Sequence, residues 1–145
     1  MLRQMIFGGA VSLANIAVHA LVMVIILGAR KIVHARVPSQ PTFRLTWIMI
    51  VVVAILMVAH LAEVALWSAA YAIVDAAAPG TDYLYFAFVN YTTLGYGDIL
   101  PAERWRLLGP MTAMNGVLLF GWSTAVIFNV LWTTISTDDF RRTYH

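Results

Sequence analysis

The segment Thr92-Thr93-Leu94-Gly95-Tyr96-Gly97-Asp98 decides the fold, and the rest of the chain is interpreted around it. Gly95 and Gly97 stand at alternate positions, and glycine reaches left-handed backbone conformations at little steric cost. A backbone that alternates between right- and left-handed conformations can turn the carbonyls of residues 93–96 toward one axis, and the Thr93 hydroxyl adds a further oxygen layer. Such stacked oxygens can replace the water around a dehydrated potassium ion. Because one strand cannot surround an ion, we expect four copies of the segment.

The composition is that of an integral membrane protein. Hydrophobic residues make up 61% of the 145 residues and charged residues 11%, against about 25% charged residues in soluble domains. Three apolar stretches, 6–29, 45–74 and 107–135, each reach the roughly 20 residues that cross a bilayer core. The chain has no cysteine, which excludes disulfides and Cys-containing metal motifs. We therefore expect three transmembrane spans.

A basic segment separates the first two spans. Residues 30–44 carry four Lys or Arg residues and two prolines, which predicts a short loop. The positive-inside rule places this loop in the cytoplasm. Three spans then put the N-terminus outside, and they put the short tail, residues 138–145, in the cytoplasm.

The segment between the second and third spans contains one short helix. Residues 76–80 read as a turn, and Thr81 or Asp82 can cap a following helix. Residues 83–92 are apolar and aromatic but too few to cross a bilayer. We predict a re-entrant helix buried in protein, because non-helical backbone at membrane depth is tolerated only there or along a water-filled path. The partial negative charge at its C-terminal end would favour a cation in front of it.

Residues 85–98 resemble the pore helix and selectivity filter of potassium channels, which share the pattern T-x-G-Y-G-D after an aromatic-rich helix. The resemblance extends over about residues 45–134. It implies an all-α membrane protein of the cell (inner) membrane, a homotetramer with three transmembrane helices, a re-entrant pore helix and a filter loop in each subunit. The implied units are an N-terminal transmembrane helix and basic loop (1–44) and a pore domain (45–137) with an outer helix (45–74), a pore helix (83–92), a filter (93–98) and an inner helix (107–135).

The resemblance also implies roles for individual residues. Potassium ions would bind along the filter, at Thr93, Leu94, Gly95, Tyr96 and Gly97. Asp98 would lie at the pore mouth and attract cations.

The third span is similar to the inner helix of bacterial two-helix potassium channels. Gly116 matches a glycine that can serve there as a gating hinge, although close helix packing explains such a glycine equally well. The residues expected to line the cavity share one helical face and are Val117, Phe120, Thr124 and Phe128. Phe128 could form a hydrophobic gate that closes by dewetting.

Three departures from the family pattern bear on the filter. Leu94 stands where valine is common, which should alter packing behind the filter. Tyr85 and Phe86 stand where many members have tryptophans. Val89 stands where some bacterial members have a carboxylate that contacts the filter aspartate, so Asp98 should lack that partner.

Polar side chains also interrupt the first two spans. Ser12, Asn15 and His19 share one helical face, and His60 and Glu63 share another. The rise of a helix places both histidines near mid-membrane, where they could meet. Ionisable residues inside a span are costly and usually mark function or pairing.

Three interpretations of His19, His60 and Glu63 remain open. They could form a polar clasp that docks the first helix onto the pore unit. They could sense protons, because histidine titrates near neutral pH. They could also bind a transition metal such as zinc, for which two imidazoles and a carboxylate are suitable ligands.

The leading interpretation of the whole chain is a channel that conducts K⁺ passively and selectively, with the His/Glu cluster as a modulator. The alternatives are a weakly selective monovalent cation channel, a metal-binding or transport protein on the same pore scaffold, and a non-conducting scaffold subunit. We find no nucleophile–base pair and no cofactor loop, so we do not expect an enzyme. The expected partners are identical subunits and membrane lipids, without nucleic acid or a small-molecule substrate.

Overall fold

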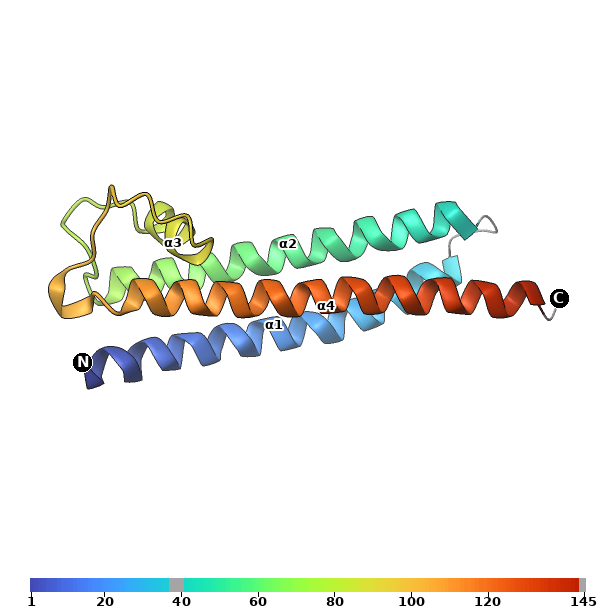
Figure 1. Ribbon diagram of the computed structural model, residues 1–145, viewed down its shortest axis with the longest axis horizontal. Helices are drawn as coiled ribbons and strands as arrows, with labels where there is room; N and C mark the ends of the chain where they lie inside the picture. Colours follow the sequence, from blue (N-terminus) through green and yellow to red (C-terminus); the bar gives the residue numbers. More distant parts are fainter. Residues whose placement is uncertain (37–40, 144–145) are drawn as a thin grey trace.

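The computed structural model describes residues 1–36 and 41–143, and the side chains of residues 1–26, 28 and 43–136. The described elements are α1 (Leu2–Arg36), α2 (Pro41–Ile73), α3 (Tyr83–Tyr91), the 3₁₀ helix η1 (Glu103–Trp105) and α4 (Leu108–Thr143). The three long helices run side by side, and each contacts the other two (Figure 1). The short helix α3 and the loops around it lie at the end of the bundle that holds the N-terminus, and the C-terminus lies at the opposite end.

Three helices are long and apolar enough to cross a membrane, in agreement with the three expected spans. The apolar segments are Leu2–Ile26, Phe43–Ile73 and Glu103–Ser136. Much of their surface is apolar and exposed in the single chain, as lipid contact or contact with further subunits would require.

The prediction of a loop at residues 30–44 is wrong for most of that segment. Helix α1 continues to Arg36 and α2 begins at Pro41, so at most residues 37–40, which lie outside the described residues, remain as the connection. Lys, Arg and Ala favour helix, and proline is tolerated at the first helical position. Helix α4 likewise continues to Thr143, through most of the predicted tail.

The helices bury two apolar cores with a polar layer between them. One core lies near the α3 end and includes Trp67, Tyr71 and Phe86. The other lies toward the C-terminal end and includes Ile26 and Val52. The stretch of α2 between the two cores contributes polar side chains, which are described with the site below.

Helix α3 is capped at its start and contacts α2 and α4. Asp82 caps its start, as expected, because its Oδ1 accepts hydrogen bonds from the backbone N–H groups of Leu84 and Tyr85 at 3.0 and 3.1 Å. Its buried residues face α2 and α4, and they are Phe86, Ala87, Val89 and Tyr91. Two loops near α3 are joined by a bridge between Ala77 and Pro101. Helix α3 therefore holds the segment that follows it against the bundle.

Candidate filter segment and the polar cluster behind it

The segment that follows α3, residues 93–98, alternates in backbone handedness. Thr93, Gly95 and Gly97 have φ values of 61°, 58° and 77°. Among the described residues, the positive φ values outside glycine are those of Asp75 and Thr93, so Leu94 and Tyr96 lie between the left-handed positions without sharing their conformation. The two glycines thus adopt the conformation expected of them, and Thr93 adopts it as well.

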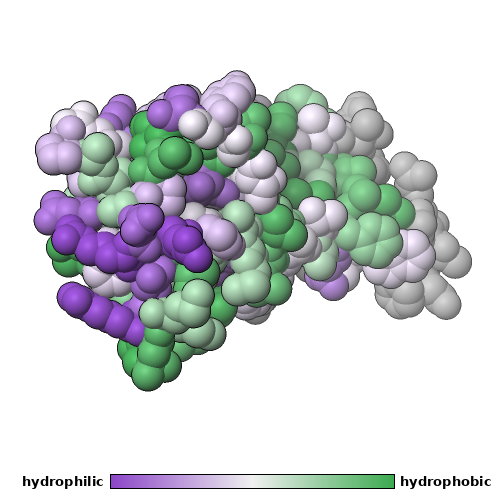
Figure 2. All heavy atoms as spheres, turned by 60° about the vertical axis from the view of Figure 1, so that its left-hand side comes forward, coloured by the Kyte–Doolittle hydropathy of each residue, from purple (hydrophilic) through white to green (hydrophobic). Residues whose placement is uncertain are grey.

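Backbone hydrogen bonds attach the start of this segment to the last turn of α3. The N–H groups of Leu94 and Gly95 both donate to the Val89 carbonyl, at 2.9 and 3.3 Å. Residues 92–98 are nevertheless exposed, with Leu94 at 54% and Tyr96 at 67%. Figure 2 shows hydrophilic residues gathered at this end of the molecule. The segment is anchored to its own chain along one side and presents the other side outward.

Asp98 has a partner that the sequence did not reveal. Val89 supplies no carboxylate, as noted above, but the Tyr85 hydroxyl donates to Asp98 Oδ2 at 2.8 Å. This hydrogen bond to a carboxylate raises the pKa of the Tyr85 hydroxyl. Tyr85 therefore connects the first turn of α3 to the far end of the candidate filter segment.

The face of α4 predicted to line a cavity is exposed in the single chain. Val117 and Phe128 are 58% and 65% exposed, and Thr124 is exposed as well. Phe120 differs from these residues, because its ring packs against His60 at 4.6 Å and against Tyr91 at 5.4 Å between centroids. Phe120 thus connects the exposed face to a buried cluster.

Gly116 lies where α4 passes the end of α3. A Cβ atom at this position would overlap the Tyr91 carbonyl oxygen and would stand 3.0 Å from the carbonyl carbon. Of the two roles considered for this glycine, close packing therefore has direct structural support.

The side chains of His19, His60 and Glu63 converge as the sequence predicted. His19 Nδ1 lies 2.8 Å from Glu63 Oε1, and His60 Nδ1 lies 3.0 Å from Glu63 Oε2. His19 and Glu63 are fully buried, and the His60 side chain is 13% exposed. The two imidazole rings are 5.6 Å apart between centroids. One carboxylate thus joins α1 to α2 inside the apolar region.

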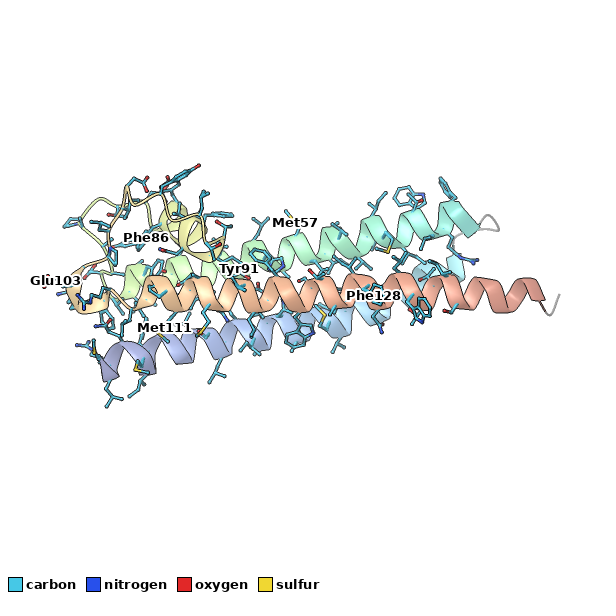
Figure 3. All side chains as sticks on the ribbon, in the orientation of Figure 1. Met57, Phe86, Tyr91, Glu103, Met111 and Phe128 are labelled. Carbon is cyan, nitrogen blue, oxygen red and sulfur yellow. The ribbon has the colours of Figure 1, made fainter. Side chains whose placement is uncertain are left out.

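Two further residues complete this cluster from α3 and α4. The Tyr91 hydroxyl donates to Glu63 Oε2, and Figure 3 shows Tyr91 where α3 approaches α2 and α4. Ser123 Oγ lies 3.0 Å from His60 Nε2 and 3.4 Å from His19 Nε2. The cluster therefore contains a polar side chain from each of the four α-helices.

A second polar contact lies about one turn closer to the α3 end. Asn15 Nδ2 donates to Asn115 Oδ1 at 2.8 Å, and Trp67 Nε1 donates to the same oxygen at 3.1 Å. Within the described residues, Asn15 Oδ1 and Ser12 Oγ are buried without a hydrogen-bond partner. Asn15, Asn115 and Trp67 add a second polar link among α1, α2 and α4.

Three members of these contacts were not predicted from the sequence, namely Tyr91, Asn115 and Ser123. A signal for two of them was present, because Asn115 and Ser123 share a helical face with Thr112 in the third span. Tyr91 carried no such signal, since an aromatic residue in a short apolar helix is usually a packing residue.

The donor set of the cluster can hold a metal ion. His19, His60 and Glu63 each offer one ligand atom, and these atoms lie within 4.8 Å of one another. Two imidazoles and a carboxylate are common zinc ligands.

Comparison with known proteins gives the family. Residues 59–133, just over half of the chain, match the model of an ion channel family, and the chain belongs to that family. The match begins in α2 at the level of the polar cluster and includes α3, the candidate filter segment and most of α4. Neither the comparison with curated proteins nor the comparison with solved structures gave a match.

Proposed function

We propose that the protein is a potassium-selective channel that conducts K⁺ passively through a homotetrameric filter. The observation that carries the proposal is the alternation of positive φ at Thr93, Gly95 and Gly97 within the sequence Thr-Leu-Gly-Tyr-Gly-Asp. Alternating handedness lets successive carbonyls face one axis, where they can replace the water shell of a potassium ion. Membership of the ion channel family supports conduction, and the filter sequence supports K⁺ as the ion.

In this proposal the carbonyls of residues 93–96 and the Thr93 hydroxyl bind the ions, and Gly97 completes the turn of the strand. The exposure of residues 92–98 in the single chain supports a tetramer, because three neighbouring strands would cover this surface. Asp98 would stand at the mouth and attract cations. The C-terminal end of α3 would direct its partial negative charge toward the cavity below the filter.

The exposed face of α4 would line that cavity. Val117 and Thr124 would face the water-filled path, with Phe128 as a hydrophobic constriction nearer the cytoplasm. Phe120 would have one edge in the cavity and one face on His60. The polar cluster therefore lies one side chain away from the proposed ion path.

Flux through purified protein in liposomes tests the proposal. We expect a K⁺ gradient to drive flux that barium blocks and a Na⁺ gradient to drive far less. Gly95→Ala should abolish this selective flux, because a left-handed conformation costs an L-residue about 1–2 kcal/mol and the cost arises in every subunit. Gly121→Ala is the matched control, since Gly121 is helical and a Cβ there meets nothing within 4 Å.

Two outcomes would change the assignment. Normal K⁺ selectivity in Gly95→Ala would show that residues 93–97 do not form the filter. Comparable K⁺ and Na⁺ flux in the wild type would instead favour a weakly selective monovalent cation channel. The motive for this test is Leu94, which stands where valine is common in potassium channels.

A further inference from the structure

We propose that His19, His60 and Glu63 form a binding site for a divalent transition-metal ion of the zinc type. The three residues come from α1 and α2, and their ligand atoms lie within 4.8 Å of one another. Zinc commonly takes two imidazoles and one carboxylate and leaves its fourth position for another oxygen. This site lies outside the ion path and would serve the architecture of the subunit.

Both imidazoles already present a ring nitrogen to the Glu63 carboxylate. His19 Nδ1 lies 2.8 Å from Oε1 and His60 Nδ1 lies 3.0 Å from Oε2. Ligand atoms around a tetrahedral zinc ion, with bonds of about 2.0–2.1 Å, stand roughly 3.3–3.5 Å apart. To admit the ion, these two contacts would lengthen and the ligand atoms, which lie within 4.8 Å of one another, would draw around it.

The polar atoms of the cluster form one connected set. The Tyr91 hydroxyl donates to Glu63 Oε2 and also lies 3.0 Å from His60 Nδ1. On the other side of the rings, both Nε2 atoms face Ser123 Oγ, at 3.0 and 3.4 Å. The two imidazoles therefore share one carboxylate on the Nδ1 side and one hydroxyl oxygen on the Nε2 side.

A metal ion on the Nδ1 side is compatible with these contacts. Each neutral imidazole would bind the ion through Nδ1 and carry its hydrogen on Nε2. Both Nε2–H groups could then donate to the two lone pairs of Ser123 Oγ, at the distances already present. Metal-bound histidines characteristically donate their second N–H to such an oxygen. Tyr91 would support the carboxylate ligand in the same way.

Neighbouring rings enclose the site. Trp122 packs against His19 at 5.2 Å and Phe120 packs against His60 at 4.6 Å between centroids. His60 keeps 13% of its side chain exposed, which leaves a side for metal entry. The ion would fasten α1 to α2 and, through Glu63 and Tyr91, set the position of the last turn of α3, from which the candidate filter segment continues.

Cobalt binding to the full chain, purified in metal-free detergent buffer, tests the site. We expect one Co²⁺ per chain after desalting, with the visible absorption of a tetrahedral site, and displacement by Zn²⁺. His19→Gln and Glu63→Gln should each lose this absorption. His34→Gln is the matched control, because it removes a histidine from the basic end of the same helix and should leave binding unchanged.

Ser123→Ala gives a second test that does not depend on removing a ligand. This small substitution should weaken cobalt binding by about 10–100-fold, as is typical for the loss of a partner of a metal-bound histidine. A wild-type chain that retains no stoichiometric cobalt overturns the proposal, and so does equal loss of binding in His19→Gln and His34→Gln. The assay measures bound metal and not flux, so its failure would leave the proposed channel function untouched.

Discussion

At the scale of single residues, the hydrogen bond between Tyr85 and Asp98 connects the first turn of α3 to the far end of the candidate filter segment. Tyr85→Phe removes the donor and leaves the carboxylate without this partner. We expect the purified protein to unfold at a temperature a few degrees lower and to sustain less of the proposed K⁺ flux, because the far end of residues 93–98 loses its attachment to α3. Tyr83→Phe, two residues earlier in the same helix, is the matched control.

The same pair predicts a pH dependence. The pKa of Tyr85 is raised by the hydrogen bond to Asp98, so the folded state holds this proton more tightly than the unfolded state. The stabilisation is therefore fully present below the ordinary tyrosine pKa of about 10 and is lost as the pH rises through the raised value. The difference in unfolding temperature between wild type and Tyr85→Phe should stay constant from about pH 6 to pH 9 and shrink above that range. A difference that already disappears near neutral pH would contradict this account.

Single residues also show which backbone conformations could be predicted from the sequence and which could not. Gly95 and Gly97 were predictable, because alternate glycines have an evident conformational use. The positive φ of Thr93 was not predictable, since a β-branched residue rarely adopts it. Thr93 directly follows the right-handed C-cap residue Thr92, and its N–H donates to the Asn90 carbonyl at 3.0 Å.

At the scale of the helices, Gly116 sets how closely α4 approaches α3. Gly116→Ala would place a methyl group against the Tyr91 carbonyl oxygen, which is backbone and cannot rotate away. We expect a loss of about 1–3 kcal/mol in stability, the usual cost of overpacking, measured by denaturant unfolding in detergent. Gly121→Ala, on an open face of the same helix, should cost much less. Unchanged stability together with altered channel opening would instead favour the hinge role.

Helix boundaries were less predictable than helix existence. Three long apolar helices were predicted from length and hydropathy, and the structure contains them. The helical ends of α1 and α2 were missed, because prolines and charges were interpreted as loop signals although Pro41 stands at the first position of α2. The convergence of His19, His60 and Glu63 was predictable from helical spacing, whereas the participation of Tyr91 depended on how α3 docks, which no local pattern specifies.

At the scale of the whole molecule, the chain forms a helical bundle with a packed interior and with apolar side chains exposed on its surface. Two apolar cores and the polar layer between them hold the helices together. Leu94 and Tyr96, and Val117 and Phe128 on α4, are more than half exposed. The candidate filter segment is exposed, and one such strand cannot surround an ion. A complete coordination cage would require several copies of the chain around one axis, which is the physical basis of the proposed tetramer.

The orientation of this bundle in the membrane provides the last prediction. The N-terminus and the candidate filter segment share one end of the molecule, and the basic segment belongs to the other end (Figure 1). The positive-inside rule therefore predicts that Glu103 faces outward and that residues 37–40 face the cytoplasm. Because the chain has no cysteine, single substitutions can report this directly. A membrane-impermeant maleimide should label Glu103→Cys on intact cells and Ser39→Cys only after permeabilisation, with the unaltered chain as the unlabelled control. The reverse pattern would invert the bundle and would place the α3 dipole and the Asp98 carboxylate on the cytoplasmic side of the ion path.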